Sequence, residues 1–447
     1  MVHSLPIATW FPFDGLPAFF QVLFSLAFLI ILMMLVWTTF LFVRGLRTDR
    51  AMDETGGEAD FDWIFMVPAL NEELTIIDSI ERLQQIQLKS KRIVVINDGS
   101  DDGTAGILAG IDNPDLAVIT RTLPEARQGK AAALNYAYSQ IREEFDLDPD
   151  RTIICIVDAD GRISPESPGF VAGHFRDPQV GGVQSLVRIY NRGGVLTWFQ
   201  NIEFSIYGHL FQVSRNKWGT AGMGGNGQYN RLAALASIDT SVEGDDDVSV
   251  KSLGPWRDRL TEDQDLGLRL LVAGWHSHQD NRARVDQQGL SNLNRLFKQR
   301  TRWSQGNLQA MQLIGPVSKS DIRLPARIEQ VIYLLMPILQ GVVGASLIAA
   351  CALALTGTDV VSGSFWWLIF IYLLGFGGTL MGCIAAKIDE KPLGLVKGLL
   401  AAQVYAFYSW LLWPVLIRST GRQLIGMDSW AKTDREEISD KRDRTSG

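Results

Sequence analysis

Two aspartates, Asp158 and Asp160, stand two residues apart directly after the apolar run at 152–157. A short apolar run is typical of a buried strand, so both carboxylates lie at a strand end and can converge on one cation. Mg²⁺ and Mn²⁺ are usually held by one or two carboxylates together with the phosphates of a substrate. The pair therefore predicts a site for a divalent cation and a nucleotide diphosphate.

Polar residues also follow the two preceding apolar runs. A single acidic turn after a strand is usually a helix cap. Three successive strand ends that carry Asp, Asn or Glu indicate a ligand site instead, because ligands collect at the carboxyl ends of parallel strands. The polar residues at the earlier ends are Asn71 and Glu72, after Pro68 and Ala69, and then Asn97 and Asp98.

Two later motifs carry further charge. Residues 261–263 (Thr-Glu-Asp) precede an apolar helical stretch and would, by themselves, be a helix-capping turn. Residues 298–304 (Lys-Gln-Arg-Thr-Arg-Trp-Ser) are basic and aromatic, which is typical of an amphipathic helix at a membrane surface. Both structural roles are compatible with a part in the chemistry.

These motifs need a scaffold of alternating strands and helices, and the stretch from 60 to 175 predicts one. Apolar runs at 63–67, 92–97 and 152–157 indicate strands, and helically spaced apolar residues at 74–87 and 126–140 indicate helices. Strands separated by helices in this order give a parallel sheet with crossover helices. The predicted fold class is therefore α/β.

Charge is distributed unevenly along the 447 residues. All 42 Lys and Arg residues lie after residue 43, and only three of them lie between 328 and 417. Four apolar segments result, at 16–43, 330–356, 364–386 and 398–417, and each is long enough to cross a hydrocarbon core of about 30 Å. A simple cytosolic enzyme is excluded, and the formal charge of −7 gives no basic excess for nucleic acid.

The basic residues also predict how the chain meets the bilayer. Residues 1–15 hold no Lys or Arg, whereas Arg44, Arg47 and Arg50 follow the first apolar segment. The positive-inside rule then places residues 1–15 outside and the central stretch in the cytoplasm. Three further crossings would leave the tail at 418–447 outside, yet it carries seven basic residues. We therefore expect one C-terminal segment to be interfacial or re-entrant and the tail to be cytoplasmic.

Together and in this order, the motifs resemble the membrane-bound branch of glycosyltransferase family 2. That branch contains cellulose, chitin, hyaluronan and poly-N-acetylglucosamine synthases and some lipid glucosyltransferases. The similarity covers residues 60–312, more than half of the chain. It implies a Rossmann-like GT-A domain inserted between transmembrane helices. It also implies a hexosyltransferase that inverts the anomeric centre, uses a UDP-sugar and depends on Mg²⁺ or Mn²⁺.

The resemblance also implies roles for individual residues. The residues on the nucleotide-sugar side are Pro68, Ala69, Asn71, Glu72, Asp98, Lys130 and Asp158. The cation is held by Asp158 and Asp160. The catalytic residues are Glu262, Asp263, Gln299, Arg302 and Trp303, with Asp263 as the general base and Trp303 near the acceptor.

Elementary chemistry agrees with these implied roles. Inversion needs a base that deprotonates the acceptor hydroxyl on the face opposite the leaving group, and Asp263 would do this. Departure of a nucleoside diphosphate develops negative charge, which the cation, Lys130 and Arg302 would offset. The indole of Trp303 offers a flat apolar face to a sugar ring.

Two places depart from the family pattern. Asn97 and Asp98 stand where many relatives have two aspartates, which leaves the contacts to the donor base open. Residues 222–231 (Gly-Met-Gly-Gly-Asn-Gly-Gln-Tyr-Asn-Arg) replace the Cys- or Ser-containing acceptor segment of the best-known polymer synthases. Glycines there would let the backbone approach the acceptor or the diphosphate. We expect Gly225 and Asn226 on the acceptor side, and an ordinary flexible turn is the alternative.

The expected organisation runs as follows. The chain would begin with an extracytoplasmic N-terminus (1–15), a transmembrane helix (16–43) and a linker (44–60). A cytoplasmic GT-A domain (61–290) and interfacial helices (291–326) would follow. C-terminal transmembrane or interfacial helices (327–417) and a charged tail (418–447) would complete it. The protein would be integral to the inner, plasma membrane. Its acceptor would be a growing β-polysaccharide that leaves through a channel of the protein's own helices. The alternatives are a lipid acceptor (diacylglycerol or polyprenyl phosphate), since four apolar segments are few for a pore, and a catalytically silent scaffold.

Overall fold

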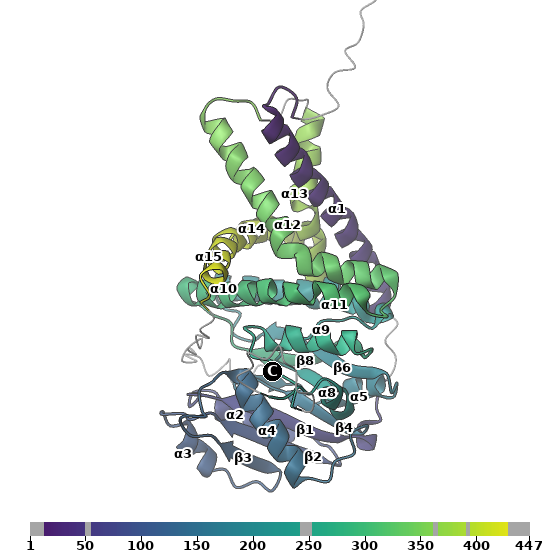
Figure 1. Cartoon of the computed structure of the whole chain (residues 1–447), viewed down its shortest axis with the longest axis vertical. Helices are drawn as coiled ribbons and strands as arrows, with labels where there is room; N and C mark the ends of the chain where they lie inside the picture. The colour runs from purple at the N-terminus through teal and green to yellow at the C-terminus, as the bar shows by residue number, and fades with distance from the viewer. Residues whose placement is uncertain (1–12, 50–54, 242–252, 361–364, 390–393, 428–447) are drawn as a thin grey trace, which may run out of the picture.

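The protein is seen in a computed structural model that describes residues 13–49, 55–241, 253–360, 365–389 and 394–427. The lower half in Figure 1 is a sheet covered by helices, and the upper half is a set of long helices. Helices α10 and α11 lie across the boundary between these halves. Predictions for residues 1–12 and for the tail from residue 428 fall outside the described residues.

One eight-stranded sheet forms the centre of the lower half. In spatial order its strands are β3 (Leu116–Thr120), β2 (Lys91–Asn97), β1 (Asp62–Ala69), β4 (Thr152–Ile156), β7 (Gln228–Arg231), β6 (Val180–Ile189), β8 (His276–Gln287) and β5 (Arg162–Ile163). The pairs β1–β2, β1–β4 and β2–β3 are parallel, whereas β7 runs antiparallel to both β4 and β6. The predicted α/β class is confirmed, but the sheet is mixed beyond β4 rather than parallel throughout.

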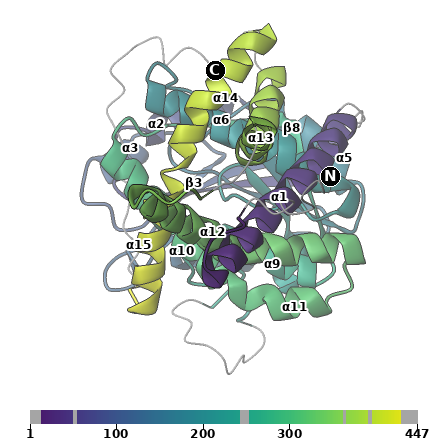
Figure 2. The same ribbon diagram turned by 90° about the horizontal axis from the view of Figure 1, so that it is seen from above.

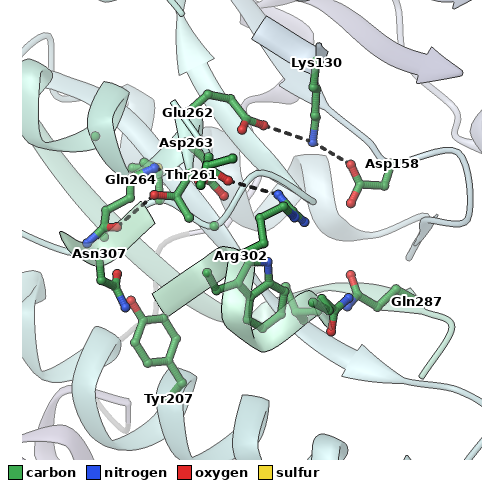
Figure 3. A pocket seen from close by; sticks show the side chains of 18 of the residues that line it. Lys130, Asp158, Tyr207, Thr261, Glu262, Asp263, Gln264, Gln287, Arg302 and Asn307 are labelled. Carbon is green, nitrogen blue, oxygen red and sulfur yellow. Dashed lines mark hydrogen bonds and ion pairs between the residues drawn. The ribbon is translucent and has the colours of Figure 1, made fainter. Parts of the chain in front are cut away.

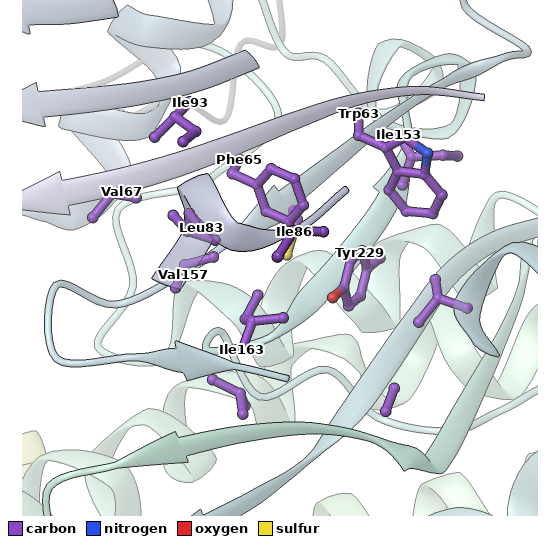
Figure 4. Close-up of a cluster of buried hydrophobic side chains, with 14 of the residues drawn as sticks. Trp63, Phe65, Val67, Leu83, Ile86, Ile93, Ile153, Val157, Ile163 and Tyr229 are labelled. Atoms are coloured by element: carbon purple, nitrogen blue, oxygen red, sulfur yellow. The ribbon is translucent and has the colours of Figure 1, made fainter. Parts of the chain in front are cut away.

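The three predicted strands are β1, β2 and β4, and both faces of β1 are buried. Trp63, Phe65 and Val67 point to one face, where they form a cluster that includes residues of α2 (Figure 4). Ile64 and Met66 point to the other face and pack with residues of α4. Burial on both faces explains why these strands read as continuous apolar runs rather than as an alternating pattern.

Short helices cover this sheet. They are α2 (Ile76–Gln85), α3 (Thr104–Ala109), α4 (Lys130–Glu144), α5 (Ser167–Phe175), α6 (Val195–Ile206), α7 (Val213–Arg215), α8 (Leu232–Ser237) and α9 (Glu262–Val272). The predicted helix at 126–140 begins only at Lys130, because Arg127 and Gly129 have φ angles of 63° and 109°, outside the helical region. The π-helical turn η2 (Tyr207–Gln212) extends α6 toward α7.

The helices of the upper half and of the boundary contain the apolar segments that the sequence analysis identified. They are α1 (Ala18–Asp49), α10 (Leu293–Ala310), α11 (Ile314–Lys319), α12 (Leu324–Leu355), α13 (Phe365–Asp389), α14 (Gly394–Ser409) and α15 (Leu412–Leu424). Within the described residues, three stretches are long and apolar enough to cross a membrane, at 18–48, 324–355 and 396–424, and a shorter apolar stretch lies within α13. The first and second of these agree with the predicted segments.

Contacts between the long helices fix their directions. Phe28 and Leu35 of α1 lie against Phe370 and Gly377 of α13, so α1 and α13 run in the same direction. A side chain at Gly377 would meet Leu35 Cδ1 at 2.6 Å, so the glycine permits this close packing. The 25 residues of α13 span about 37 Å, enough for a crossing.

The last two helices return to the half of the molecule that contains the sheet. The hydroxyls of Ser304 in α10 and Ser419 in α15 are 2.8 Å apart, and Gln305 Nε2 donates to the carbonyl of Met427 over 2.8 Å. Figures 1 and 2 both show α15 beside α10. The end of the described chain therefore lies on the same side of the long helices as the sheet. Residues 396–424 are also long and apolar enough to cross a membrane, so an interfacial C-terminal segment stays a prediction.

Cysteine labelling would test this arrangement. In a Cys351→Ser background, which leaves only two buried cysteines, we expect Met427→Cys and Asp359→Cys to react with an impermeant maleimide from opposite sides of sealed vesicles. Lys89→Cys, on the exposed surface of the sheet domain, serves as the reference and should label together with Met427→Cys. Labelling of Met427→Cys together with Asp359→Cys would mean that α14 and α15 cross the bilayer.

Candidate active site

A cavity of about 580 Å³ lies between the carboxyl ends of β1, β2 and β4 and the helices α9, α10 and α12 (Figure 3). Eleven of the predicted site residues line it: Pro68, Ala69, Glu72, Asp98, Lys130, Asp158, Glu262, Asp263, Gln299, Arg302 and Trp303. The other four, Asn71, Asp160, Gly225 and Asn226, are not part of its lining. Residues from 68 to 303 in sequence thus meet around one space.

Asn71 and Glu72 hold the strand-end loops together. Asn71, in the left-handed region with φ 54°, donates through its backbone N–H to Ser100 Oγ and through Nδ2 to Asp101 Oδ1. The buried Glu72 donates through its backbone N–H to the hydroxyl of Thr104 over 2.8 Å. These bonds tie the end of β1 to the loop after β2, so they shape the nucleotide end of the cavity.

Asp98 does not stand alone at this end. Its Oδ1 accepts from Arg121 Nη1 at 2.6 Å, and both side chains are buried. Burial raises the pKa of Asp98, and the nearby guanidinium of Arg121 opposes that shift. Arg121 follows β3, a strand that the sequence did not predict, so sequence reasoning missed this partner. Arg121 is not part of the cavity lining, so the carboxylate of Asp98 faces the cavity and the guanidinium of Arg121 supports it from behind.

Lys130, the first residue of α4, lies between two carboxylates (Figure 3). Its Nζ is 2.7 Å from Asp158 Oδ1 and 3.7 Å from Glu262 Oε1. Burial by itself would lower the pKa of Lys130, but Asp158 and Glu262 raise it more, so the net shift is upward. The residue is therefore a fixed positive charge at the centre of the cavity.

The two aspartates predicted to share a cation have different surroundings. Asp158 faces the cavity with 30% of its side chain exposed. Asp160 is only 4% exposed, and its Oδ2 accepts from the backbone N–H of Gln288 at 3.2 Å. Of the predicted pair, only Asp158 lines the cavity, and a shared cation stays a prediction. The two residues follow β4 in an irregular loop, where a spacing of two does not place side chains on one face.

Asp158 nevertheless suits a divalent cation bound with its substrate. Among the described residues, no three or more His, Cys, Asp or Glu side chains form a cluster for a metal ion. Mg²⁺ and Mn²⁺ do not require one, since one or two carboxylates and the phosphate oxygens of a substrate are enough. The exposed carboxylate of Asp158 beside Lys130 provides that chemistry.

Asp263 lies in the first turn of α9 and is partly buried in the cavity wall. Its Oδ1 accepts from the backbone N–H of Gln264 at 2.8 Å. Burial and the neighbouring Glu262 raise the pKa of Asp263 to about 7, while Lys130 and Arg302 oppose the shift. A carboxylate with this pKa can accept a proton near neutral pH.

The glycine-rich loop brings its backbone against Asp263. Gly225 has φ 76°, and a Cβ built there would lie 2.8 Å from Asp263 Oδ2. Asn226 is buried, and its Oδ1 accepts from the backbone N–H of Asp158 while its Nδ2 donates to Gln287 Oε1. Gly225 thus lies beside the carboxylate of Asp263, and Asn226 links Asp158 to Gln287. The expected place of both residues on the acceptor side stays a prediction.

Helix α10 supplies the side of the cavity nearest the long helices. Its N-terminus is capped by Asn292, whose side chain accepts from the backbone N–H groups of Asn294 and Arg295. Arg302 Nη1 donates to the carbonyl of Leu260 over 3.0 Å, just before the Thr-Glu-Asp motif. The helix expected at the membrane boundary is therefore the helix that carries the expected site residues Gln299, Arg302 and Trp303.

Several cavity residues have no counterpart among the sequence predictions. Gln264 Nε2 donates to the hydroxyl of Tyr333 in α12 over 3.4 Å, and the hydroxyl of Tyr207 lies 3.5 Å from that of Tyr333. Beneath them, Arg215 and Glu329 form a buried ion pair of 2.6 Å. One signal was available, because Glu329 is an acidic residue at the start of an apolar segment, where an unpaired charge would be costly.

Comparison with known proteins identifies the family. A sequence model described as "Glycosyltransferase like family 2" matches residues 62–306, more than half of the chain. Poly-beta-1,6-N-acetyl-D-glucosamine synthase from Staphylococcus aureus (strain COL) is 27% identical over 250 residues, which are 55% of each chain. The synthase of the same name from Staphylococcus epidermidis is 26% identical over the same coverage. The chain thus spans about half the length of these relatives.

Among solved structures, a mannosyltransferase from Pyrobaculum calidifontis, in complex with GDP-mannose and Mn²⁺, has a similar fold. Its TM-score is 0.57 at 18% identity, and the match covers 90% of this chain and 99% of that one. At this identity the likeness is one of fold. The sheet topology and the flanking apolar helices agree with the family match. The chain belongs to glycosyltransferase-like family 2, and its GT-A domain is set between helices that are long and apolar enough to cross a membrane.

Proposed function

We propose that the protein is a membrane-integrated, inverting glycosyltransferase that moves a sugar from a UDP-sugar to an acceptor hydroxyl. The observation that carries this proposal is that one cavity is lined by Lys130, Asp158, Asp263 and Trp303. Groups that suit a diphosphate, a general base and a sugar-stacking ring therefore surround the same space.

Asp263 is the proposed base. Its pKa of about 7 lets it take the proton of the acceptor hydroxyl as that oxygen attacks the anomeric carbon. The glycine at 225 leaves room beside Oδ2, where the hydroxyl would approach. Glu262 keeps this pKa high through its negative charge and anchors Lys130, so its proposed role is electrostatic.

The leaving diphosphate needs positive charge. Lys130 and Arg302 both line the cavity and would balance the charge that develops on the phosphate oxygens. A divalent cation held by Asp158 and the diphosphate, with Asp160 behind it, would add to this balance when bound. The Mn²⁺ bound by the mannosyltransferase of similar fold is compatible with this proposal.

The proposed donor base is uracil. Uracil presents one N–H between two carbonyl oxygens, and the carboxylate of Asp98, which lines the cavity, offers an acceptor for that N–H. Pro68 and Ala69 at the end of β1 line the same end of the cavity and would flank the nucleoside.

The proposed acceptor is a β-linked glycan that is extended by repeated transfer. The 27% identical relatives are named as synthases of such a polymer. The cavity end beyond Asp263 also suits a glycan, because Tyr207, Trp303, Tyr333 and Tyr405 line it and aromatic faces pack on sugar rings. Repeated transfer needs the product to move away from the base after each step.

Transfer of a single sugar to a lipid-linked acceptor is the second candidate, and one observation favours it. From α12 the described cavity lining includes only Gln330 and Tyr333, near the start of that helix, and it includes no described residue of α1 or α13. The lining thus ends at the boundary between the two halves. A lipid acceptor would need no path beyond that point.

We also propose that the catalytic domain is cytoplasmic and the protein integral to the inner membrane. Arg44 and Arg47 at the catalytic end of α1 support this orientation through the positive-inside rule. In this proposal α1, α12 and α13 cross the membrane, and the sheet domain between α1 and α12 lies in the cytoplasm. Helices α14 and α15 then rest at the boundary, which gives the basic tail the cytoplasmic side.

Replacement of the base would test the chemistry. We expect Asp263→Asn to lower UDP release by about 10²–10⁴-fold, because the amide cannot accept the proton. In the parent, kcat/KM should fall as pH drops below about 7, where Asp263 becomes protonated. The measurement is UDP release with Mn²⁺ or Mg²⁺ across pH 5–9, and Asp112→Asn on the exposed surface is the matched control. Release by Asp263→Asn at the parental rate would refute the assignment.

The loop beside the base allows a paired test. Gly225→Ala puts a methyl group 2.8 Å from Asp263 Oδ2 at a positive φ, so we expect about a tenfold or greater loss of kcat. Gly224→Ala meets nothing closer than 3.7 Å and should lose much less. Equal losses in the two variants, measured as UDP release, would show that contact with Asp263 is not what the glycine permits.

The product distinguishes the two acceptor classes. With a labelled UDP-sugar supplied to membranes that contain the protein, we expect label in material that stays out of chloroform–methanol and grows in length with time. Membranes that contain Asp263→Asn provide the background. Label that extracts wholly into chloroform–methanol, with one sugar per lipid, would contradict repeated transfer and support the lipid acceptor.

A further inference from the structure

Glu203 is an isolated charge in an unusual place. It is the only Asp, Glu, Lys or Arg between Arg192 and Arg215, in a helix otherwise rich in apolar and aromatic residues. Its side chain lines the cavity and is 33% exposed. None of the roles given above uses this carboxylate, although it shares the cavity with Asp263.

One oxygen of this carboxylate is held in place and the other is not. Glu203 Oε2 accepts from Arg300 Nη2 at 2.7 Å and from the hydroxyl of Tyr408 at 2.9 Å. Glu203 Oε1 makes no hydrogen bond to any residue within the described parts of the chain. The carboxylate is therefore fixed by one oxygen and able to accept a hydrogen bond through the other.

Arg300 links this carboxylate to the side chains proposed for the acceptor. Its guanidinium carbon lies 4.1 Å from the ring centroid of Trp303, and its Nη1 donates to Gln299 Oε1 over 2.8 Å. The side chain of Arg300 is only 11% exposed. Charge pairing and stacking thus hold a carboxylate, an amide and an indole from α6 and α10 as one unit, with Tyr408 of α14 behind it.

The neighbours of Glu203 suit a sugar more than a lipid chain. Phe204, Trp303 and Tyr405 line the same cavity, and the Phe204 and Trp303 rings meet edge to face with centroids 6.1 Å apart. Aromatic faces beside a carboxylate match the two surfaces of a pyranose, which has apolar C–H faces and a rim of hydroxyl donors. A diacylglycerol offers one hydroxyl, which the base would take, so it leaves no donor for Glu203.

We propose that Glu203 is an acceptor-binding residue that accepts a hydrogen bond through Oε1 from a hydroxyl of a sugar already present on the acceptor. The inference rests on the proposed function and narrows it, because the acceptor is then a glycan or a glycosylated lipid. Arg300 and Tyr408 are positioning residues, since they act on the acceptor only through the carboxylate and the indole.

Glu203→Gln is the informative variant. The glutamine carbonyl can still accept from Arg300 and Tyr408, while its NH₂ group replaces Oε1, so an acceptor of hydrogen bonds becomes a donor. The probes are cello-oligosaccharides, chito-oligosaccharides and β-1,6-linked N-acetylglucosamine oligomers of one to four units. Each is titrated into purified full-length protein with the UDP-sugar that the parent hydrolyses fastest, and UDP release is measured with and without the probe.

In the parent, at least one oligosaccharide should stimulate UDP release. Glu203→Gln should raise the KM for that oligosaccharide by about tenfold or more, as expected for loss of a hydrogen bond to a charged group, with a much smaller change in kcat and in the KM for the donor. Tyr408→Phe, which removes one bond to Oε2, should raise the same KM by less. Tyr372→Phe is the matched control, because it removes a different tyrosine hydrogen bond, to Gln403 of α14, and should behave like the parent.

Three results would overturn the inference. One is a KM for the oligosaccharide that is the same in Glu203→Gln as in the parent. Another is a fall in kcat with an unchanged oligosaccharide KM, as a purely structural role would give. The third is a parent that releases UDP but is stimulated by no oligosaccharide, especially if vesicles that contain dioleoylglycerol do stimulate it. A parent that releases no UDP from any UDP-sugar would refute the proposed function itself, so the two failures are distinguishable.

Discussion

The ion pairs of Lys130 are the interaction on which the rest of the site depends. One ammonium, 2.7 Å from Asp158 and 3.7 Å from Glu262, joins the end of β4 to the starts of α4 and α9. Because one cation lies close to carboxylates from two other segments, it favours a single arrangement of the three. The same charge opposes the rise in the pKa of Asp263 that burial and Glu262 cause. The charge of Lys130 therefore affects both the position of the proposed base Asp263 and its affinity for a proton.

A second set of charge pairs connects α12 and α10 to the helices around this centre. Arg215 and Glu329 pair at 2.6 Å between α7 and α12, and Arg300 and Glu203 pair at 2.7 Å between α10 and α6. Hydrophobic packing alone is poor at fixing register between helices at a bilayer surface, because lipid is as apolar as the helices themselves. Charge pairs have a much narrower range of geometry. They can hold the aromatic end of the cavity at a constant distance from Asp263.

Sequence and structure agree where local physics determines the outcome. β1, β2 and β4 were predictable because strands buried on both faces are continuous apolar runs, and eleven site residues line the cavity because they follow such strands or form compact motifs. β8 was not predictable, because His276–Gln287 is mostly polar and forms a strand by pairing with β6. Asp160 and Asn226 do not line the cavity, which the sequence could not foretell because irregular loops give no periodicity. Glu203 and Arg121 act through distant partners, which no local pattern reveals.

The boundary between the halves gives the chain's uneven charge a structural explanation. A GT-A domain by itself would leave its acceptor side open to water, but here α10, α12 and α14 supply Trp303, Tyr333 and Tyr405 to that side. On the proposed roles, the acceptor approaches Asp263 from the end where the long helices begin. The apolar helices then do more than anchor the enzyme, because they form part of the wall against which the acceptor binds. This explains why polar residues such as Glu329 persist at the start of an apolar segment: each is satisfied by a residue of the catalytic half.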